Sequence, residues 1–232
     1  MFKTRPLNTL AAFGFTVGLM IVGLPLVASQ SKPTATPNPS EATAEVTTEV
    51  TYNCPCSIWE TPVPKTKNQN DAAGVEVGLK FQTLVDGYVT GVRFYKGSAN
   101  KGEHSGHLWS KDGKLLAEVT FKDETDSGWQ EASFDEPVAV TAKTTYVISY
   151  FTNSGWYSVD RPALGKDVVN GPLVALQSKS SGGNGVYIYT GKPRFPNQTF
   201  APTNYWVDVI FVTDLDAEAT PEVTATVTPK SS

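Results

Sequence analysis

The stretch Val75-Glu-Val-Gly-Leu-Lys-Phe81 alternates apolar residues with polar or small ones along its whole length. In a β-strand successive side chains point to opposite faces, so a period of two places the apolar side chains together. The apolar face consists of Val75, Val77, Leu79 and Phe81. The other face carries Glu76, Gly78 and Lys80. The pattern therefore predicts a half-buried strand.

Turn signals separate similar short runs along much of the chain. Asp86-Gly87 precedes the run 88–96, and Asp112-Gly113 lies between 107–110 and 114–121, which is typical of a β-hairpin. No segment shows the apolar period of an amphipathic helix. The remaining turn signals, interpreted in the same way, predict about nine or ten short strands, with turns roughly every 8–12 residues. We expect an all-β fold, a two-sheet antiparallel β-sandwich that is jelly-roll-like.

Composition agrees with a turn-rich β fold and argues against one class of partner. The 232 residues include 19 Gly and 16 Pro, and only 18% of residues are charged. The formal net charge is −4, and no segment forms a basic stripe. Phosphate-driven binding of nucleic acid is therefore not expected.

The N-terminus has the pattern of a targeting segment. Lys3 and Arg5 precede an apolar run at Leu10–Ala28, and small residues follow at its end. This predicts a secretory signal peptide over 1–29, cleaved after Ser29. The apolar run is also long enough to span a bilayer, so an uncleaved membrane anchor is the alternative. Either interpretation places the rest of the chain outside the cytoplasm, secreted or tethered at a surface.

Two low-complexity segments flank the predicted domain. Residues 30–51 and 214–232 are rich in Thr, Pro, Ala, Glu and Val. Such composition buries too little apolar surface to offset chain entropy, so both segments are predicted to be disordered. The folded β-sandwich domain is therefore expected over 52–213.

Eight motifs in this domain resemble, in their order and spacing, the bacterial family called domain of unknown function 4082. They are Cys54-Pro-Cys-Ser-Ile-Trp59, Val75-Glu-Val-Gly-Leu-Lys-Phe81, Asp86-Gly-Tyr-Val-Thr-Gly-Val-Arg-Phe-Tyr-Lys-Gly97, Gly106-His-Leu-Trp-Ser110, Glu124-Thr-Asp-Ser-Gly-Trp-Gln130, Thr144-Thr-Tyr-Val147, Gly182-Gly-Asn-Gly-Val-Tyr187 and Asn204-Tyr-Trp-Val-Asp-Val209. The resemblance implies a β-sandwich module of secreted proteins, and it implies no particular activity. The chain departs from the family pattern at Gly155-Trp156-Tyr157, where Gly-His-Tyr is expected.

The chain offers little that points to catalysis. Its two histidines, His104 and His107, lie in Gly102-Glu-His-Ser-Gly-His-Leu108, without the H-E-x-x-H frame of a zinc hydrolase. We expect both to be solvated residues of a turn and a strand entry, with a weak metal site as the alternative. The chain also lacks a G-x-S-x-G nucleophile motif. An enzyme is therefore not expected.

Cys54 and Cys56 are the only cysteines. Outside the cytoplasm, two thiols this close in sequence tend to oxidise, so a local Cys54–Cys56 disulfide is predicted. Its loop is so small that it adds little stability by restricting the unfolded chain. Reduced thiols, metal ligation and an intermolecular link are the alternatives.

Three charged residues interrupt otherwise apolar strands. Glu76, Arg93 and Asp208 would form an acid–arginine–acid cluster if their strands are neighbours. The simplest interpretation is a polar outer face with salt bridges. A sharper hypothesis is a structural calcium ion bound by Glu76 and Asp208, since Ca²⁺ prefers oxygen ligands. No other cofactor is implied.

Aromatic residues beside polar loops are the strongest functional indication. Trp156 and Tyr157 follow a polar loop, and Tyr187 and Tyr189 flank a glycine-rich one. The predicted ligand-binding residues are Trp156, Tyr157, Tyr187 and Tyr189, with Asn153 and Asn184 as hydrogen-bonding partners. Flat aromatic faces stack on sugar rings while amides bind hydroxyl groups, although ordinary loop packing explains such residues as well.

The sequence thus predicts a non-catalytic module that binds polysaccharide or another cell-surface polymer. The alternative is a structural spacer or adhesion module with a protein partner. A glycan-acting hydrolase is the third interpretation, and it would need two converging carboxylates in a cleft. Contact with a membrane is expected only through residues 1–29.

Overall fold

The computed structural model describes residues 50–215, and this part of the chain is all-β. Its strands are β1 (Thr66–Asn70), β2 (Val75–Thr83), β3 (Gly87–Lys96), β4 (His104–Ser110), β5 (Leu115–Thr120), β6 (Gly128–Val140), β7 (Tyr146–Thr152), β8 (Trp156–Val159), β9 (Val168–Asn170), β10 (Leu173–Ala175), β11 (Val186–Tyr189), β12 (Gln198–Thr199) and β13 (Val207–Val212). The all-β prediction is confirmed. There are more strands than the turn signals predict, because β9, β10 and β12 are only two or three residues long.

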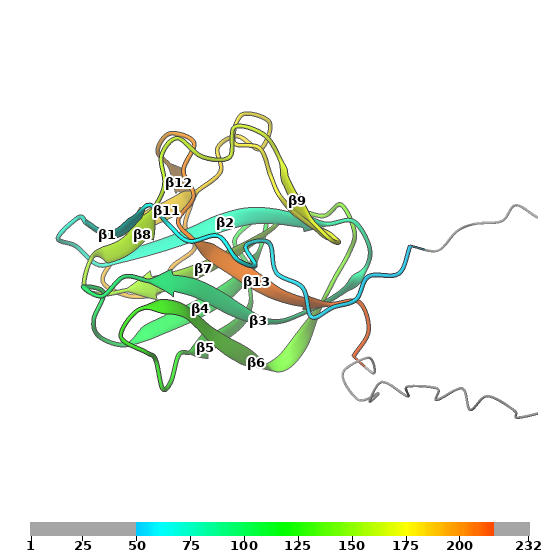
Figure 1. Ribbon diagram of the computed structural model, residues 1–232, viewed down its shortest axis with the longest axis horizontal. Coiled ribbons are helices and arrows are strands. Elements are labelled where there is room, and N and C mark those ends of the chain that lie inside the picture. Colours follow the sequence, from blue (N-terminus) through cyan, green and yellow to red (C-terminus); the bar gives the residue numbers. More distant parts are fainter. Residues whose placement is uncertain (1–49, 216–232) are drawn as a thin grey trace, which may run out of the picture. The chain divides into compact units, whose positions relative to one another are not determined.

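The larger sheet is antiparallel and has the order β12-β11-β2-β7-β4-β5. Strand β2 is central: β7 pairs along one side of it, whereas β11 and β10 share the other side. The short strand β9 extends the sheet beyond β10, and β9 and β12 rise above β2 in Figure 1. Strands β1 and β8 form a separate two-stranded sheet.

The smaller sheet has the order β13-β3-β6 and faces the larger one, which gives the β-sandwich (Figure 1). The core between the sheets is rich in aromatic side chains. Phe94 of β3 stacks on Tyr150 of β7, with ring centroids 4.0 Å apart, and Phe121 meets Phe94 edge-on. Tight packing also explains Gly106 of β4, because a Cβ atom there would lie 2.2 Å from the Val92 side chain.

Strand β2 is buried on both faces, so its predicted half-burial is wrong. The apolar face joins the core, as expected, but Glu76 on the other face is also fully buried. The cause is the segment after β11, which folds back over this outer face. There Phe195 packs against Trp109, with ring centroids 5.7 Å apart, and the Arg194 backbone amide donates to Glu76.

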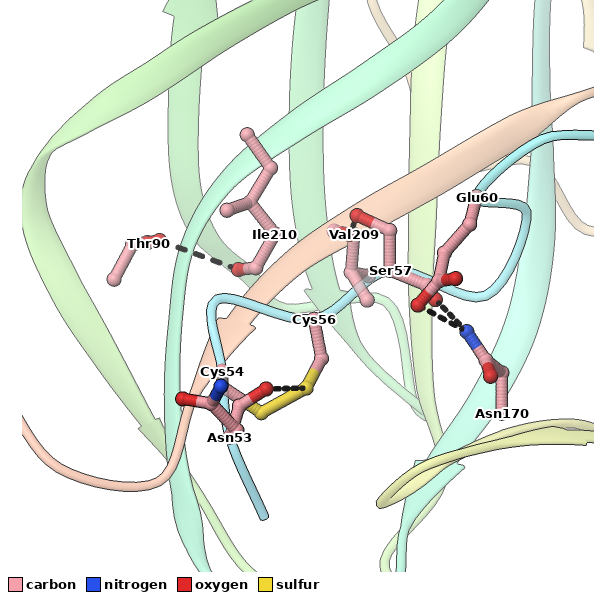
Figure 2. The surroundings of a disulfide bond; sticks show 9 residues. All are labelled: Asn53, Cys54, Cys56, Ser57, Glu60, Thr90, Asn170, Val209 and Ile210. Atoms are coloured by element: carbon pink, nitrogen blue, oxygen red, sulfur yellow. Dashed lines mark hydrogen bonds between the residues drawn. A yellow bond between two sulfur atoms is a disulfide. The ribbon is translucent and has the colours of Figure 1, made fainter.

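The N-terminal part of the domain runs along the free edge of β13 (Figure 2). Cys54 and Cys56 form a disulfide, and Cys56 exchanges two backbone hydrogen bonds with Phe211. The Ser57 hydroxyl donates to the Val209 carbonyl, and the Asn170 side chain donates to the Ser57 carbonyl. Since an unpaired strand edge invites pairing with other chains, this segment protects β13.

Several expectations concern residues that lie outside the described part. They are the signal peptide or anchor at 1–29, most of the linker at 30–51 and most of the tail at 214–232. Within residues 50–215, no helix is long and apolar enough to cross a membrane.

Candidate functional site

One pocket of the described domain, of about 180 Å³, is rich in tyrosine. We call it the tyrosine pocket, and its principal lining residues are Asp71, Tyr157, Arg161, Tyr187, Tyr189 and Tyr205. They come from the β1–β2 turn, from β8 and the residues after it, from β11, and from the residues before β13. Segments far apart in the sequence thus meet in one site.

Strand periodicity positions two of the tyrosines. Tyr187 and Tyr189 are two residues apart in β11, so both rings point to the same face. Their partners across the ladder are Val77 and Val75 of β2, which also line the pocket. The two tyrosine rings contact each other edge-on, with centroids 5.4 Å apart. The result is an aromatic wall beside an apolar floor.

Asp71 accepts hydrogen bonds from two of these tyrosines. The Tyr157 hydroxyl lies 2.5 Å from Asp71 Oδ2, and the Tyr189 hydroxyl lies 2.7 Å from the same atom. The hydrogen bond to Asp71, together with burial, raises the pKa of Tyr189 to about 12. Burial and the same carboxylate raise the pKa of Tyr157 as well. Both phenols therefore stay protonated and keep donating to Asp71.

Arg161 supplies the positive charge of the pocket. Its Nε donates to Thr203 Oγ1 at 3.3 Å, and its guanidinium lies over the Phe200 ring, 5.3 Å from the centroid. Burial, the largest single effect, works against the charge, but the hydrogen bonds and charge interactions with Tyr157 and Tyr205 together outweigh it, so the pKa of Arg161 is raised. Within residues 50–215, no carboxylate forms an ion pair with Arg161. Its charge is thus available to a ligand.

The structure brings together three of the six residues predicted to bind a ligand: Tyr157, Tyr187 and Tyr189. Trp156 does not line the pocket, because neighbours in β8 point to opposite faces. Asn153 is exposed in the loop before β8 and does not line it either.

Asn184 serves the fold instead. It is fully buried, and its Oδ1 accepts from the backbone amides of Lys80 and Gly185. Its Nδ2 donates to the carbonyls of Lys80 and Leu176. Because all of its hydrogen bonds are made within the protein, we do not assign Asn184 to a binding site.

Sequence reasoning missed Asp71, Arg161 and Tyr205 as members of the site. Asp71 and Arg161 look like ordinary loop residues, and nothing local links them to β11. The Tyr205 ring contacts both Tyr157 and Tyr187, at 5.5 and 6.4 Å between centroids. Its position next to Trp206, in Asn204-Tyr-Trp206, was the one available signal.

The histidines are not solvated, contrary to expectation. His104 is fully buried between the sheets, and His107 is 1% exposed on the outer face of the larger sheet. His104 Nδ1 lies 2.8 Å from Glu124 Oε1, and Glu124 also pairs with Lys96 Nζ at 2.8 Å. His104 Nε2 lies 2.9 Å from the Asn100 side chain, so both ring nitrogens are engaged.

His107 is bound by a buried carboxylate of its own. Its Nδ1 lies 2.8 Å from Glu76 Oε1, and the Ser149 hydroxyl donates to the same oxygen at 2.6 Å. Trp109 Nε1 donates to Ser149 Oγ at 2.7 Å. Both histidines were misjudged because their partners are distant in sequence: Glu76 precedes His107 by 31 residues, and Glu124 follows His104 by 20.

The predicted acid–arginine–acid cluster exists only in part. Arg93 and Asp208 are paired across β3 and β13, with Arg93 Nε 3.8 Å from Asp208 Oδ2. Glu76 belongs to the other sheet and contacts His107 instead. Both predicted calcium ligands therefore face hydrogen-bond donors, and they do not converge.

Asp208 fastens the N-terminal segment to the domain. Its carboxylate is fully buried and accepts from the backbone amides of Ile58, Trp59 and Val209, each at 2.8 Å. Burial raises the pKa of Asp208 to about 6, against the opposing effect of these amides and of Arg93. Its role in the described structure is to hold backbone.

Fold and pocket together define an antiparallel β-sandwich module with an aromatic pocket beside β2 and β11 of the larger sheet. The family model described as Domain of unknown function (DUF4082) matches residues 61–207, which is most of the domain. The chain belongs to this family. A comparison with curated proteins found no match.

Proposed function

We propose that this chain is an extracytoplasmic, non-catalytic module that binds carbohydrate or another cell-surface polymer in the tyrosine pocket. The supporting observation is the arrangement of aromatic rings around one carboxylate and one arginine without an ion-pair partner among the described residues. Flat rings offer apolar faces to the C–H groups of a sugar, while Asp71 and Arg161 offer hydrogen bonds to its hydroxyl or acidic groups.

The size of the pocket supports recognition of a small unit. Its volume of about 180 Å³ is below the roughly 300–1,000 Å³ of pockets that enclose a drug-sized ligand. A single ring at a chain end or branch would fit this scale, with the remainder of the polymer outside. The exposed ring of Tyr189 would then contact the entering unit first.

The polar groups of the pocket favour binding over hydrolysis. Asp71 is the only carboxylate among the lining residues, and two tyrosine hydroxyls already donate to it. Glycoside hydrolysis generally requires two carboxyl groups on either side of the scissile bond. This pocket therefore supports a binding module.

The experiment is a screen of the full-length protein against glycans and insoluble polysaccharides. Tyr189→Ala removes an exposed pocket wall, and we expect at least a tenfold loss of affinity for any ligand found. Trp156→Ala is the matched control, since Trp156 neighbours the pocket without lining it. Circular dichroism would confirm that both variants remain folded.

Each outcome decides between interpretations. Loss of binding in Trp156→Ala with retention in Tyr189→Ala would replace the pocket with a surface platform around β8. Absence of binding across the whole panel would reject the carbohydrate proposal and favour a spacer or adhesion module with a protein partner.

A further inference from the structure

A second pocket lies on the outer face of the larger sheet, where His107 reaches its surface. Its volume is about 500 Å³, and we call it the histidine pocket. The lining residues that matter here are Glu103, Ser105, His107, Glu118, Thr120 and Asp135. Ser105 and His107 belong to β4, and they pair across the ladder with Thr120 and Glu118 of β5. The floor of the pocket is thus rigid sheet.

His107 is held in a single orientation. The Nδ1 edge of the ring faces the Glu76 carboxylate, which is itself fully buried. In the neutral imidazole, a proton on Nδ1 leaves Nε2 as a hydrogen-bond acceptor. Within residues 50–215, Nε2 makes no hydrogen bond, although the side chain is 99% enclosed and lines the pocket. A fixed acceptor is therefore left open at this surface.

The remaining lining groups add negative charge. Glu103, Glu118 and Asp135 carry three carboxylates, and Lys122 supplies one ammonium group. Ser105 and Thr120 contribute hydroxyl groups beside them. A ligand that fits these groups is compact, positively charged and rich in hydrogen-bond donors.

We infer that the histidine pocket binds a primary ammonium group, which donates to His107 Nε2 and is attracted by the negative charge that Glu103, Glu118 and Asp135 give the pocket lining. An ammonium group has three donors and no acceptor, which matches a pocket dominated by acceptors. In the described part of the chain, no group of three or more His, Cys, Asp or Glu residues is arranged to hold a metal ion. The chemistry therefore favours an organic cation.

Two sources carry this chemistry: the free amine of an amino sugar and the side chain of lysine. Both present a primary ammonium on a flexible or ring-bound carbon. Acetylation of the amino sugar removes its charge and two of its three N–H donors while leaving the ring unchanged. N-acetylglucosamine is thus a matched negative ligand for glucosamine.

The test uses ¹⁵N NMR of the two histidine side chains in the full-length protein. Because the chain has only two histidines, His104 is an internal control within the same strand. Titration with glucosamine or with Nα-acetyl-lysine amide at low salt and neutral pH should shift the Nε2 resonance of His107, with a dissociation constant on the order of millimolar. The His104 resonances should not move, and N-acetylglucosamine should have no effect.

Charge substitutions at exposed positions test the carboxylates without disturbing the core. Glu118→Gln and Asp135→Asn should each weaken ammonium binding about fivefold at low ionic strength. Glu136→Gln is the control, because Glu136 is adjacent in β6 and does not line the histidine pocket. His107→Gln should abolish binding, provided that its unfolding transition shows a folded protein.

Three results would overturn the inference. They are an unchanged His107 resonance at saturating ligand, an equal response to N-acetylglucosamine, and unaltered affinity in both carboxylate variants. A response to Zn²⁺ with none to either amine would assign the site to a metal instead. The outcome is independent of the tyrosine pocket, since Tyr189→Ala leaves every group of the histidine pocket in place.

Discussion

His104 and His107 lie three residues apart in one strand, yet they define two different environments. Each has Nδ1 2.8 Å from a glutamate oxygen and each is almost fully enclosed. Because the odd spacing sends them to opposite faces of β4, His104 joins the core and His107 faces outward. The Nε2 of His104 is closed by Asn100, whereas that of His107 opens onto a pocket.

The difference separates a group that holds the fold from one that is free to act. Around His104 the network continues through Asn100 to the hydroxyl groups of Thr152 and Ser154, at 2.7 and 2.8 Å. Around His107 it runs only inward, through Glu76. A buried polar network that joins side chains of several segments contributes rigidity, while one that ends at a pocket leaves an unused acceptor for a ligand. Replacing the glutamate partner of each histidine by glutamine should therefore change the free energy of unfolding by unequal amounts.

The largest effect is expected from Glu124→Gln. The substitution leaves the Lys96 ammonium without a carboxylate partner, and the Lys96 side chain is only 8% exposed. Removing one partner of a buried ion pair costs about 3–5 kcal/mol in the free energy of unfolding. Urea denaturation measures this loss. Asp126→Asn is the control, since the Asp126–Lys101 pair is exposed and should contribute less than about 1 kcal/mol. Equal losses in the two variants would refute the structural role assigned to the buried Glu124–Lys96 pair.

Glu76→Gln should lower the free energy of unfolding by less, about 1–2 kcal/mol. The amide oxygen can still accept from His107 and Ser149, and no lysine loses an ion-pair partner. The same urea experiment gives this value. A loss as large as that in Glu124→Gln would mean that the outer network also holds the fold, and the contrast between the two histidines would disappear.

The smallest effect is on pH dependence and concerns His104. Burial lowers the pKa of His104 below 6.5, although Glu124 opposes this. The unfolded chain then binds the proton more tightly, so the contribution of His104 to stability is present above about pH 6.5 and is lost as the pH falls through its folded value. NMR titration of the His104 C2 proton should give a midpoint below 6.5, and a midpoint above 6.5 would contradict the prediction.

Stability curves can isolate the same contribution. The difference in unfolding free energy between wild type and His104→Gln should decrease between pH 7 and pH 5. The difference is needed because Asp208, with its pKa raised to about 6, acts in the opposite sense. Its contribution is fully present below about pH 3.8 and is lost as the pH rises through 6.

The fold class could be predicted because it depends on local patterns. Alternation in Val75–Phe81 and the Asp112-Gly113 turn signal are set by residues adjacent in the chain, and both appear as expected in β2 and the β4–β5 hairpin. Burial of Glu76 could not be predicted in this way. It depends on Trp109 and Phe195, which reach the outer face of β2 from other elements.

The candidate site shows the same limit. Tyr187 and Tyr189 share a face by strand periodicity, which the sequence indicates, but their meeting with Asp71 and Arg161 depends on tertiary packing. Adjacency also misleads: Trp156 and Tyr157 were predicted together, yet only Tyr157 lines the pocket. Local pattern thus predicts the elements, and long-range contact decides which side chains form a site.

The hydrogen bonds between Cys56 and Phe211 also determine how the domain responds to tension. The described domain begins and ends near this antiparallel pairing, so the chain enters and leaves on the same side (Figure 1). A force that separates its two ends would load the two Cys56–Phe211 hydrogen bonds first, and the amides held by Asp208 would come next. The folded domain would therefore lie to the side of a stretched chain. It would add little to the length of that chain until these hydrogen bonds break.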